Sequence, residues 1–307
     1  MMGILVSEAT NVVVVGIDDP NVQVTARQMI AYGTRVVAGV RTGGAGSSVA
    51  GIPVYRTIAE AASARPDAAL IAVPLAAVLD ACLEALSHSI RFLVIATSGV
   101  PERATSLITD RARDAMARVI GPGSAGIISP AAHIKLGAIG GDESDRAFSP
   151  GRIGIMSGSG EAAARIGKTA RKLRLGVSTA ISLGTGELTT ATPAQLLPLF
   201  ESDRETSGVV LDANVIAGSG EAIAGAIRSR RYIKPLLIAA SRPKPTGMSA
   251  NSHVPEAMIG AAEPADIEPL RDLGALIAER PGDLSQLLSL TFLNRPYLGN
   301  PLGDEDD

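Results

Sequence analysis

Two serines and a glycine in the middle of the chain have the types and spacing needed to hold an anion. An apolar run ends at Ser157, small residues continue through Ser159 and Gly160, and a helix-forming segment runs from Glu161 to about Leu173. The pattern predicts a strand, a tight turn and a helix. Such a turn directs free backbone N–H groups and the positive end of the helix dipole at a ligand. The three residues therefore form a predicted phosphate site, or a small-residue turn of the kind that any parallel α/β unit needs.

A histidine in the second half could meet this turn. His253 ends a Pro- and Ser-rich loop, residues 241–253, which follows a predicted strand at 235–240. The carboxyl ends of parallel strands lie at one edge of a sheet, so this loop falls at the same edge as the serine turn. Two other small-residue loops, at 184–187 and 214–220, also follow predicted strands. We expect these loops to converge on one site.

The first turn of the chain carries acids where a dinucleotide-binding turn carries glycines. An apolar strand, residues 12–15, ends at Gly16 and is followed by Asp18 and Asp19. The glycines of the dinucleotide fingerprint are missing, and two carboxylates would repel a pyrophosphate. No acid beyond Val40 is placed to bind a ribose. These observations disfavour an NAD(P)-dependent oxidoreductase.

Alternating apolar runs and helical patterns would position these loops. In the first half, the expected strands lie at 12–15, 35–40, 68–73, 91–96 and 118–121. In the second half, they lie at 152–156, 177–183, 208–211 and 235–240. The alternation predicts an α/β protein, with a doubly wound parallel sheet followed by a parallel layer of flavodoxin-like size. The expected divisions are a Rossmann-like domain at 1–130, a connection at 131–150, a second domain at 151–294 and an acidic tail at 295–307.

Composition disfavours several other classes of protein. Of the 307 residues, 46% are hydrophobic and only 3% aromatic, which is typical of aliphatic buried sheets. The net charge of −3 comes with scattered basic residues, so the chain lacks the electrostatic footprint of a nucleic-acid-binding protein. No apolar run is long enough to span a membrane, no secretory signal is recognisable, and the lone Cys82 excludes an internal disulfide. We expect a cytoplasmic protein and predict no metal site.

Short motifs along almost the whole chain resemble the α subunit of succinyl-CoA synthetase and related NDP-forming acid–CoA ligases. The matching segments are Ile30-Ala31-Tyr32-Gly33-Thr34 with Gly39-Val40, Gly51-Ile52-Pro53-Val54, Val73-Pro74, Gly99-Val100-Pro101, Ile120-Gly121-Pro122, Gly126-Ile127-Ile128-Ser129-Pro130 and Gly154 to Gly160. The resemblance implies a Rossmann-like CoA-binding domain followed by a flavodoxin-like ligase domain.

The resemblance also implies roles for individual residues. It identifies His253 as the phosphorylated catalytic histidine; the alternative is a loop histidine without a role. A carboxylate near an imidazole fixes its tautomer, and the neighbouring Glu256 is a candidate for this. It implies a β-type ATP-grasp partner subunit that binds ATP or GTP with Mg, and a small carboxylic acid as substrate. A homo-oligomer is a further option. The residues that the resemblance places at CoA are Gly16, Asn21, Val40, Val73, Pro74, Thr97 and Ser98.

Several ligand positions depart from the family pattern. Asp18 to Gln23 replace the CoA loop, and Gly44 stands where the family has a lysine, so we expect CoA binding to be weak or dependent on the partner. Gly123, Glu161 and Asn214 replace an Asn, a Thr and the Glu that pairs with the histidine. Two interpretations stay open. The chain is an active acid–CoA ligase subunit, or it is a repurposed relative that binds a partner or a different acyl or carbamoyl substrate.

Overall fold

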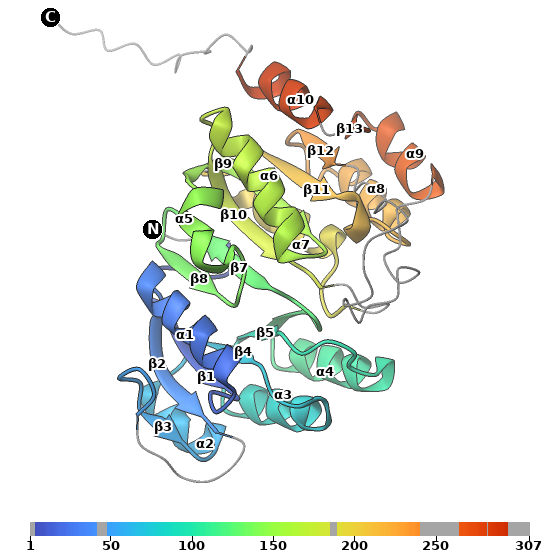
Figure 1. Ribbon diagram of the computed structural model, residues 1–307. Coiled ribbons are helices and arrows are strands. Elements are labelled where there is room, and N and C mark those ends of the chain that lie inside the picture. Colours follow the sequence, from blue (N-terminus) through green and yellow to red (C-terminus); the bar gives the residue numbers. More distant parts are fainter. Residues whose placement is uncertain (1–3, 42–47, 185–188, 240–263, 281, 294–307) are drawn as a thin grey trace, which may run out of the picture.

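The computed structural model describes residues 4–41, 48–184, 189–239, 264–280 and 282–293. Within these residues the chain forms two β-sheets, each flanked by helices (Figure 1). The first sheet is built from the amino-terminal part of the chain, and the second contains the strand that leads to the serine turn. The α/β fold class predicted from the sequence is confirmed.

The first sheet is parallel throughout its described strands and has the order β3-β2-β1-β4-β5-β6. In its centre, Val15 pairs with Val40 on one side and with Ile71 on the other. The direction of winding reverses between β1 and β4, so a ligand crevice is expected beyond the carboxyl ends of these strands. The strands are β1 (Asn11–Val15), β2 (Arg35–Val40), β3 (Val54–Tyr55), β4 (Ala68–Ile71), β5 (Phe92–Ile95) and β6 (Arg118–Ile120).

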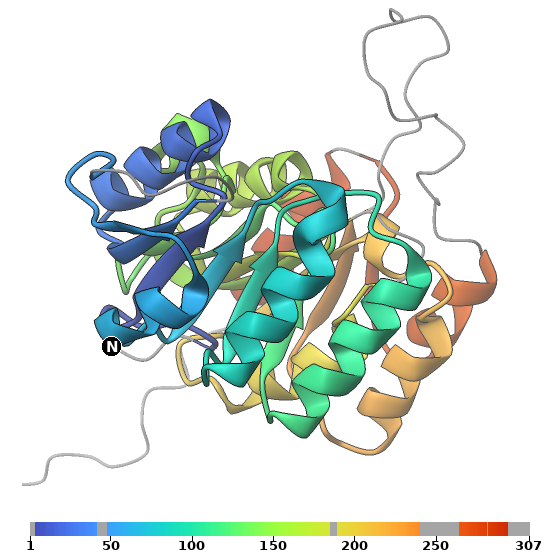
Figure 2. The ribbon, with the colours of Figure 1, turned by 90° about the horizontal axis from the view of Figure 1, so that it is seen from below.

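Helices cover both faces of this sheet. Val13 and Val15 point into a core shared with α3 and α4, whereas Val12 and Val14 point into a core shared with α1 and the second sheet. Figure 2 shows α3 and α4 side by side on the first of these faces. The helices are α1 (Pro20–Tyr32), α2 (Ile58–Ala61), α3 (Val78–Ser87) and α4 (Glu102–Asp114), with 3₁₀ turns η1 (Ala62–Ala64) and η2 (Leu75–Ala77).

Local signals in the sequence set both ends of α1. Asp19 caps its start, because the carboxylate accepts a hydrogen bond from the Asn21 N–H at 2.7 Å and Pro20 occupies the first helical position. The helix ends at Gly33, whose φ is +120°. A Cβ at Gly33 would lie 2.6 Å from the carbonyl oxygen of His133. The end of α1 therefore packs directly on the turn between β7 and β8 of the second sheet.

The second sheet is mixed and has the order β13-β12-β11-β9-β10-β7-β8. The strands β9 (Pro150–Ser157), β10 (Val177–Ser182), β11 (Gly208–Asp212), β12 (Leu236–Ala239) and β13 (Leu276–Ala278) are parallel, whereas β7 (Gly126–Ser129) and β8 (Ile134–Leu136) are antiparallel to their neighbours. Its helices and 3₁₀ turns are η3 (Gly141–Glu143), α5 (Ser144–Ala147), α6 (Gly160–Lys172), α7 (Pro193–Ser202), η4 (Ala213–Val215), α8 (Gly220–Arg228), α9 (Pro264–Asp272) and α10 (Asp283–Phe292). No helix in the described ranges is long and apolar enough to cross a membrane.

The β7–β8 hairpin belongs to the second sheet, and Figure 1 shows it lying against α1. The sequence pattern instead assigns residues up to 130 to the first domain and 131–150 to a connection. The difference arises because each strand of the hairpin is only three or four residues long and pairs antiparallel, which the alternation of strands and helices does not reveal. The exact domain limits stay a prediction, but residues 126–136 lie in the second sheet.

A buried lysine holds the segment that follows the hairpin. The Lys135 amine donates to the Gly141 carbonyl, and to the Ser144 hydroxyl at 2.9 Å. Burial lowers the pKa of Lys135 to about 8, and the nearby carboxylates of Asp142 and Asp145 oppose this effect. The polar contacts of the amine thus fix the turn that leads into α5.

Candidate functional site

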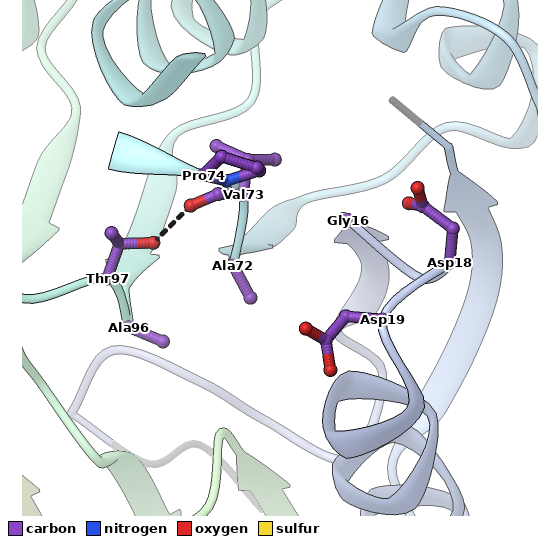
Figure 3. A pocket seen from close by; sticks show the side chains of 8 residues that line it. All are labelled: Gly16, Asp18, Asp19, Ala72, Val73, Pro74, Ala96 and Thr97. Carbon is purple, nitrogen blue, oxygen red and sulfur yellow. Dashed lines mark hydrogen bonds between the residues drawn. The ribbon is translucent and has the colours of Figure 1, made fainter. Parts of the chain in front are cut away.

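A pocket of about 460 Å³ lies beyond the carboxyl ends of β1, β4 and β5, where the topology of the first sheet places a ligand crevice (Figure 3). Backbone and small side chains form much of its wall. Its lining residues are Gly16, Asp18, Asp19, Ala72, Val73, Pro74, Ala96 and Thr97. This pocket is the candidate CoA site of the first domain.

Four of the seven residues assigned to CoA from the sequence line this pocket: Gly16, Val73, Pro74 and Thr97. Gly16 has a φ of +93°, and a Cβ there would lie 2.1 Å from the Ala72 carbonyl oxygen. Only glycine lets the loops after β1 and β4 approach so closely. The Thr97 hydroxyl donates to the Val73 carbonyl at 2.7 Å, which ties the loop after β5 to the loop after β4 (Figure 3).

The other three assigned residues lie outside the lining of the pocket. Asn21 is in the first turn of α1, where its N–H donates to the cap of the helix. Val40 is buried, and its carbonyl accepts from the N–H groups of Gly16 and Ile17. Ser98 lies next to Gly123, where a Cβ would be 3.1 Å from the Ser98 hydroxyl. Contacts of these three residues with CoA stay a prediction.

The pocket is acidic on the side of α1. Asp18 and Asp19, the two acids of the first turn, both line it. The Asp19 carboxylate already accepts a hydrogen bond at the start of α1, so the positive end of that helix is partly satisfied within the protein. A diphosphate in this crevice would face two negative charges. Ala72 and Ala96 also line the pocket, and their side chains carry no chemical signal by which the sequence analysis could find them.

The predicted phosphate turn forms a strand-to-helix connection between β9 and α6. The Ser157 hydroxyl is buried and donates to the Ser159 carbonyl at 2.8 Å. Ser159 is the N-cap of α6, since its hydroxyl accepts from the Ala162 N–H at 3.2 Å. Within the described ranges, the N–H groups of residues 158–161 donate to no acceptor. They remain able to bind an anion at the positive end of the helix.

Glu161 does not lie over this turn. Its side chain is 86% exposed and pairs at 3.5 Å with Arg165, one helical turn further along α6. The carboxylate therefore lies along the outer surface of the helix. An acid in the first turn of a helix could repel a phosphate bound there, but the Glu161 carboxylate points away from the turn.

At the start of α8, which follows β11, a carboxylate of the protein itself accepts hydrogen bonds from the free backbone N–H groups. The Asp266 carboxylate accepts from the N–H groups of Gly218 and Gly220, at 3.1 and 3.4 Å. A Cβ at Gly220 would lie 2.3 Å from the Asp266 carbonyl oxygen, so α9 packs tightly on this helix start. Of the helix starts after β9 and β11, the one at α6 is therefore the better anion site.

Two polar side chains lie at the carboxyl end of β11, next to β9: Asp212 is its last residue and Asn214 lies in η4. Leu211 pairs with Met156, which places Asp212 beside the start of the serine turn. Asp212 is only 2% exposed, and its carboxylate accepts from the Asn214 amide at 3.3 Å. The side-chain amide oxygen of Asn214, Oδ1, is buried and has no hydrogen-bond partner in the described part of the chain. Asn214 thus offers an acceptor at the position where the resemblance implies a Glu.

Loops connect the pocket and the serine turn along one edge of the molecule. The Gly123 N–H donates to the Thr97 carbonyl at 3.0 Å, so the loop after β6 rests on the wall of the pocket. On its other side, a Cβ at Gly184 would lie 2.0 Å from the Pro122 carbonyl oxygen. Gly184 follows β10, the neighbour of β9. The carboxyl edges of the two sheets therefore meet. His253, Glu256 and Gly44 lie outside the described residues.

Comparison with known proteins identifies the family. The CoA binding domain model matches residues 7–99, and the succinyl-CoA ligase like flavodoxin domain model matches residues 150–291. Subunit alpha 1 of the ADP-forming succinate–CoA ligase of Archaeoglobus fulgidus is 35% identical over 281 residues, covering 91% of this chain and 94% of the relative. The chain belongs to the succinate–CoA ligase α-subunit family. The CoA-binding and flavodoxin-like ligase domains inferred from its motifs are confirmed.

Relatives in this ligase family act on other acids, and solved structures share its fold. The malate–CoA ligase subunit alpha of Methylorubrum extorquens is 31% identical, covering 94% of this chain and 98% of the relative. ATP citrate lyase of Methanosaeta concilii, solved with (3S)-citryl-CoA, superposes with a TM-score of 0.77 at 18% identity, covering 98% of this chain and 52% of that one. Acetyl-coenzyme A synthetase 1 of Ca. Korarchaeum cryptofilum, solved with phosphate and ADP, has a TM-score of 0.70 at 21% identity, covering 90% and 59%. The chain thus spans a little over half the length of these solved chains.

Proposed function

We propose that this chain is the α-type subunit of an NDP-forming acid–CoA ligase that works through a phosphohistidine. The free N–H groups at the start of α6 carry the proposal, because they form an anion site beside a buried serine and are not blocked by Glu161. In this function, the carboxylate of an acid takes the phosphoryl group to form an acyl phosphate. The thiol of CoA then attacks the acyl carbon, which forms the thioester and releases inorganic phosphate. The continuous edge between the pocket and the serine turn supports both steps on one surface.

His253 is the proposed phosphoryl carrier. A neutral imidazole is a nucleophile near pH 7, and an acceptor on its other nitrogen fixes the tautomer. Glu256, three residues further along the chain, is one candidate for this acceptor. The buried acceptor of Asn214, backed by Asp212, supports a second way to orient an imidazole above the turn. The positive end of α6 would stabilise the charge of a phosphohistidine bound there.

The proposal includes a partner and its nucleotide. The chain's membership in an α-subunit family implies a β-type subunit, and we propose that this subunit carries an ATP-grasp domain and binds ATP or GTP with Mg. The substrate is a small carboxylic acid, and the site of action is the cytoplasm. CoA binds at the first-domain pocket, weakly or with the help of the partner, because the pocket is acidic.

A repurposed relative is the second candidate. The acidic lining of the pocket favours it, since Asp18 and Asp19 oppose the diphosphate of CoA. Such a protein would keep the scaffold and bind a partner or a different acyl or carbamoyl substrate. Phosphorylation of the histidine separates the two candidates.

The test is phosphate incorporation by the full chain, purified together with the β-type subunit expressed alongside it. We expect acid-labile, base-stable label from ATP or GTP in the wild-type chain and none in the His253→Asn variant. His88→Asn is the matched control, because His88 lies at the exposed end of α3 and its ring nitrogen contacts Ser87 and the Glu84 carbonyl of that helix. Label that persists in His253→Asn would place the chemistry at another residue. A wild-type complex that takes up no label would favour the repurposed relative.

A further inference from the structure

An arginine at the end of β2 has no side-chain partner among the residues that the structure describes. Arg41 follows the last residue of β2, and its Nε atom is buried without a hydrogen-bond acceptor. No ion pair or side-chain hydrogen bond of Arg41 exists in the described part of the chain. Leaving a buried donor unpaired costs free energy, and more so on a charged group. An anionic ligand that accepted a hydrogen bond from the guanidinium group would remove this cost.

The backbone places Arg41 next to the candidate CoA pocket. Its N–H donates to the Tyr55 carbonyl at 3.1 Å, which holds it at the end of the sheet. The preceding carbonyl, that of Val40, accepts from the N–H groups of Gly16 and Ile17 at 2.9 and 3.1 Å. Gly16 lines the pocket. Arg41 therefore directly follows the residue that is hydrogen-bonded to the turn in the pocket wall.

The sheet also orients this residue toward the face of α1. Val40 points into the core shared with α3, whereas a Cβ at Gly39 would lie 2.8 Å from Ile17, on the opposite face. Side chains alternate along a strand, so Arg41 falls on the same face as Gly39. Ile17 packs in the core shared with α1, so that face carries the acidic turn of the pocket.

In doubly wound sheets that bind nucleotides, the end of the second strand contacts the ribose. A nucleotide bound across the crevice places its ribose there, and the residue at this strand end reads the ribose hydroxyls. An acid selects a free hydroxyl, while an arginine accommodates a phosphate carried by the ribose. CoA carries such a phosphate at the 3′ position. A guanidinium group can grip it with two parallel N–H donors.

Arg41 is a cation that the backbone holds beside the pocket, at a residue next to the carbonyl that binds Gly16. The lining holds two carboxylates and no basic side chain, and the lysine of the family pattern is Gly44 here. We propose that Arg41 is the receptor for the phosphate on the ribose of CoA, and that it makes the chain prefer CoA to 3′-dephospho-CoA. This inference rests on the proposed function, because it takes CoA as the ligand of the pocket.

The experiment compares the two ligands in calorimetric titrations of the full chain, alone and with its β-type partner. We expect the wild-type chain to bind CoA at least about tenfold more tightly than 3′-dephospho-CoA, the gain of one charge-assisted contact. Arg41→Ala should lose this preference because its affinity for CoA falls while its affinity for 3′-dephospho-CoA does not change. Arg41→Lys should retain part of the preference. Arg56→Ala is the matched control, because Arg56 is exposed at the end of the neighbouring strand β3 and should keep the wild-type ratio.

The outcomes separate the inference from the function on which it rests. Equal weakening of both ligands in Arg41→Ala, or no change in either, would overturn the role of Arg41 while CoA binding by the wild-type chain still stands. A wild-type complex that binds neither ligand would overturn the proposed function and the inference together. A preference that survives in Arg41→Ala would assign the 3′-phosphate to another cation. Thermal melting of each variant confirms that the titrated protein is folded.

Discussion

Thr34 and Lys135 exchange two hydrogen bonds where the two sheets meet. The Thr34 hydroxyl donates to the Lys135 carbonyl at 2.6 Å and accepts from the Lys135 N–H at 3.0 Å. Both residues are buried. Lys135 lies in β8, the last strand of its sheet, so Thr34 satisfies backbone groups that would otherwise need another strand.

We expect Thr34→Val to destabilise the protein by about 1–3 kcal/mol, because the N–H and carbonyl of Lys135 lose their partner in a buried place. The free energy of unfolding in urea measures the effect. Thr25→Val is the control, since the Thr25 hydroxyl donates to the Asn21 carbonyl within α1 in a solvent-exposed bond. Its cost should stay below about 0.5 kcal/mol. Equal losses for the two variants would contradict the role given to Thr34.

The exposed position of Glu161 predicts that Glu161→Thr changes phosphate affinity by less than about threefold, since an exposed ion pair contributes little. Titration of the full chain with inorganic phosphate measures this. Glu221→Thr is the control, because Glu221 occupies the first turn of α8 and forms an exposed ion pair with Arg228, two helical turns further along. A tenfold gain confined to the Glu161 variant would mean that its carboxylate reaches the turn in solution.

The acidic pocket predicts that the isolated chain binds CoA more weakly than the low-micromolar range. Asp19→Ser should raise the affinity by roughly 3–10-fold, because it removes one charge from the pocket while serine still caps α1. Asp110→Ser, which removes an exposed acid of α4 paired with Arg113, should leave it unchanged. Low-micromolar binding by the wild-type chain, or no gain in the Asp19 variant, would show that the pocket charge matters less than we infer.

The lowered pKa of Lys135 predicts a pH-dependent difference between the wild-type chain and Lys135→Met. The pKa is about 8 in the folded protein and about 10.4 in an unfolded chain. Between these values the unfolded chain holds a proton that the folded chain has released, so the Lys135 contribution to the free energy of unfolding rises with pH. The wild-type chain should therefore gain stability relative to the variant between about pH 8 and pH 10.

Urea unfolding at several pH values in this window provides the measurement. Burial raises the pKa of the Cys82 thiol to about 12 and also raises the pKa of Tyr32, but both groups are present in either protein and cancel in the difference. A difference that stays constant with pH would show that the Lys135 amine keeps its proton throughout.

The sequence predicts best where local chemistry and topology agree. The serine turn is an example: an apolar strand, small residues and a helix former mark it, and β9 and α6 occur within a residue or two of the expected limits. Gly16, Val73, Pro74 and Thr97 are likewise found together, because they follow strands whose carboxyl ends must meet in a parallel sheet.

Features that depend on distant pairing were missed or left open. The local sequence does not predict β13, because Leu276–Ala278 is only three residues long and becomes a strand by pairing with β12. The direction of Glu161 depends on its pairing with Arg165. The arginine at the end of β2 escaped notice because its significance lies in the missing partner of one atom, which a sequence does not display.

The β7–β8 hairpin makes the halves of this protein difficult to separate. A fragment that stops at residue 130 would carry β7 without the strand β10 against which it pairs. A fragment that starts at residue 151 would lack both hairpin strands, and β10 would become a bare edge whose backbone groups invite pairing with other chains. Either piece would be prone to aggregate, so crystallisation or partner-mapping work that cuts the chain should keep residues 126–136 with the second sheet.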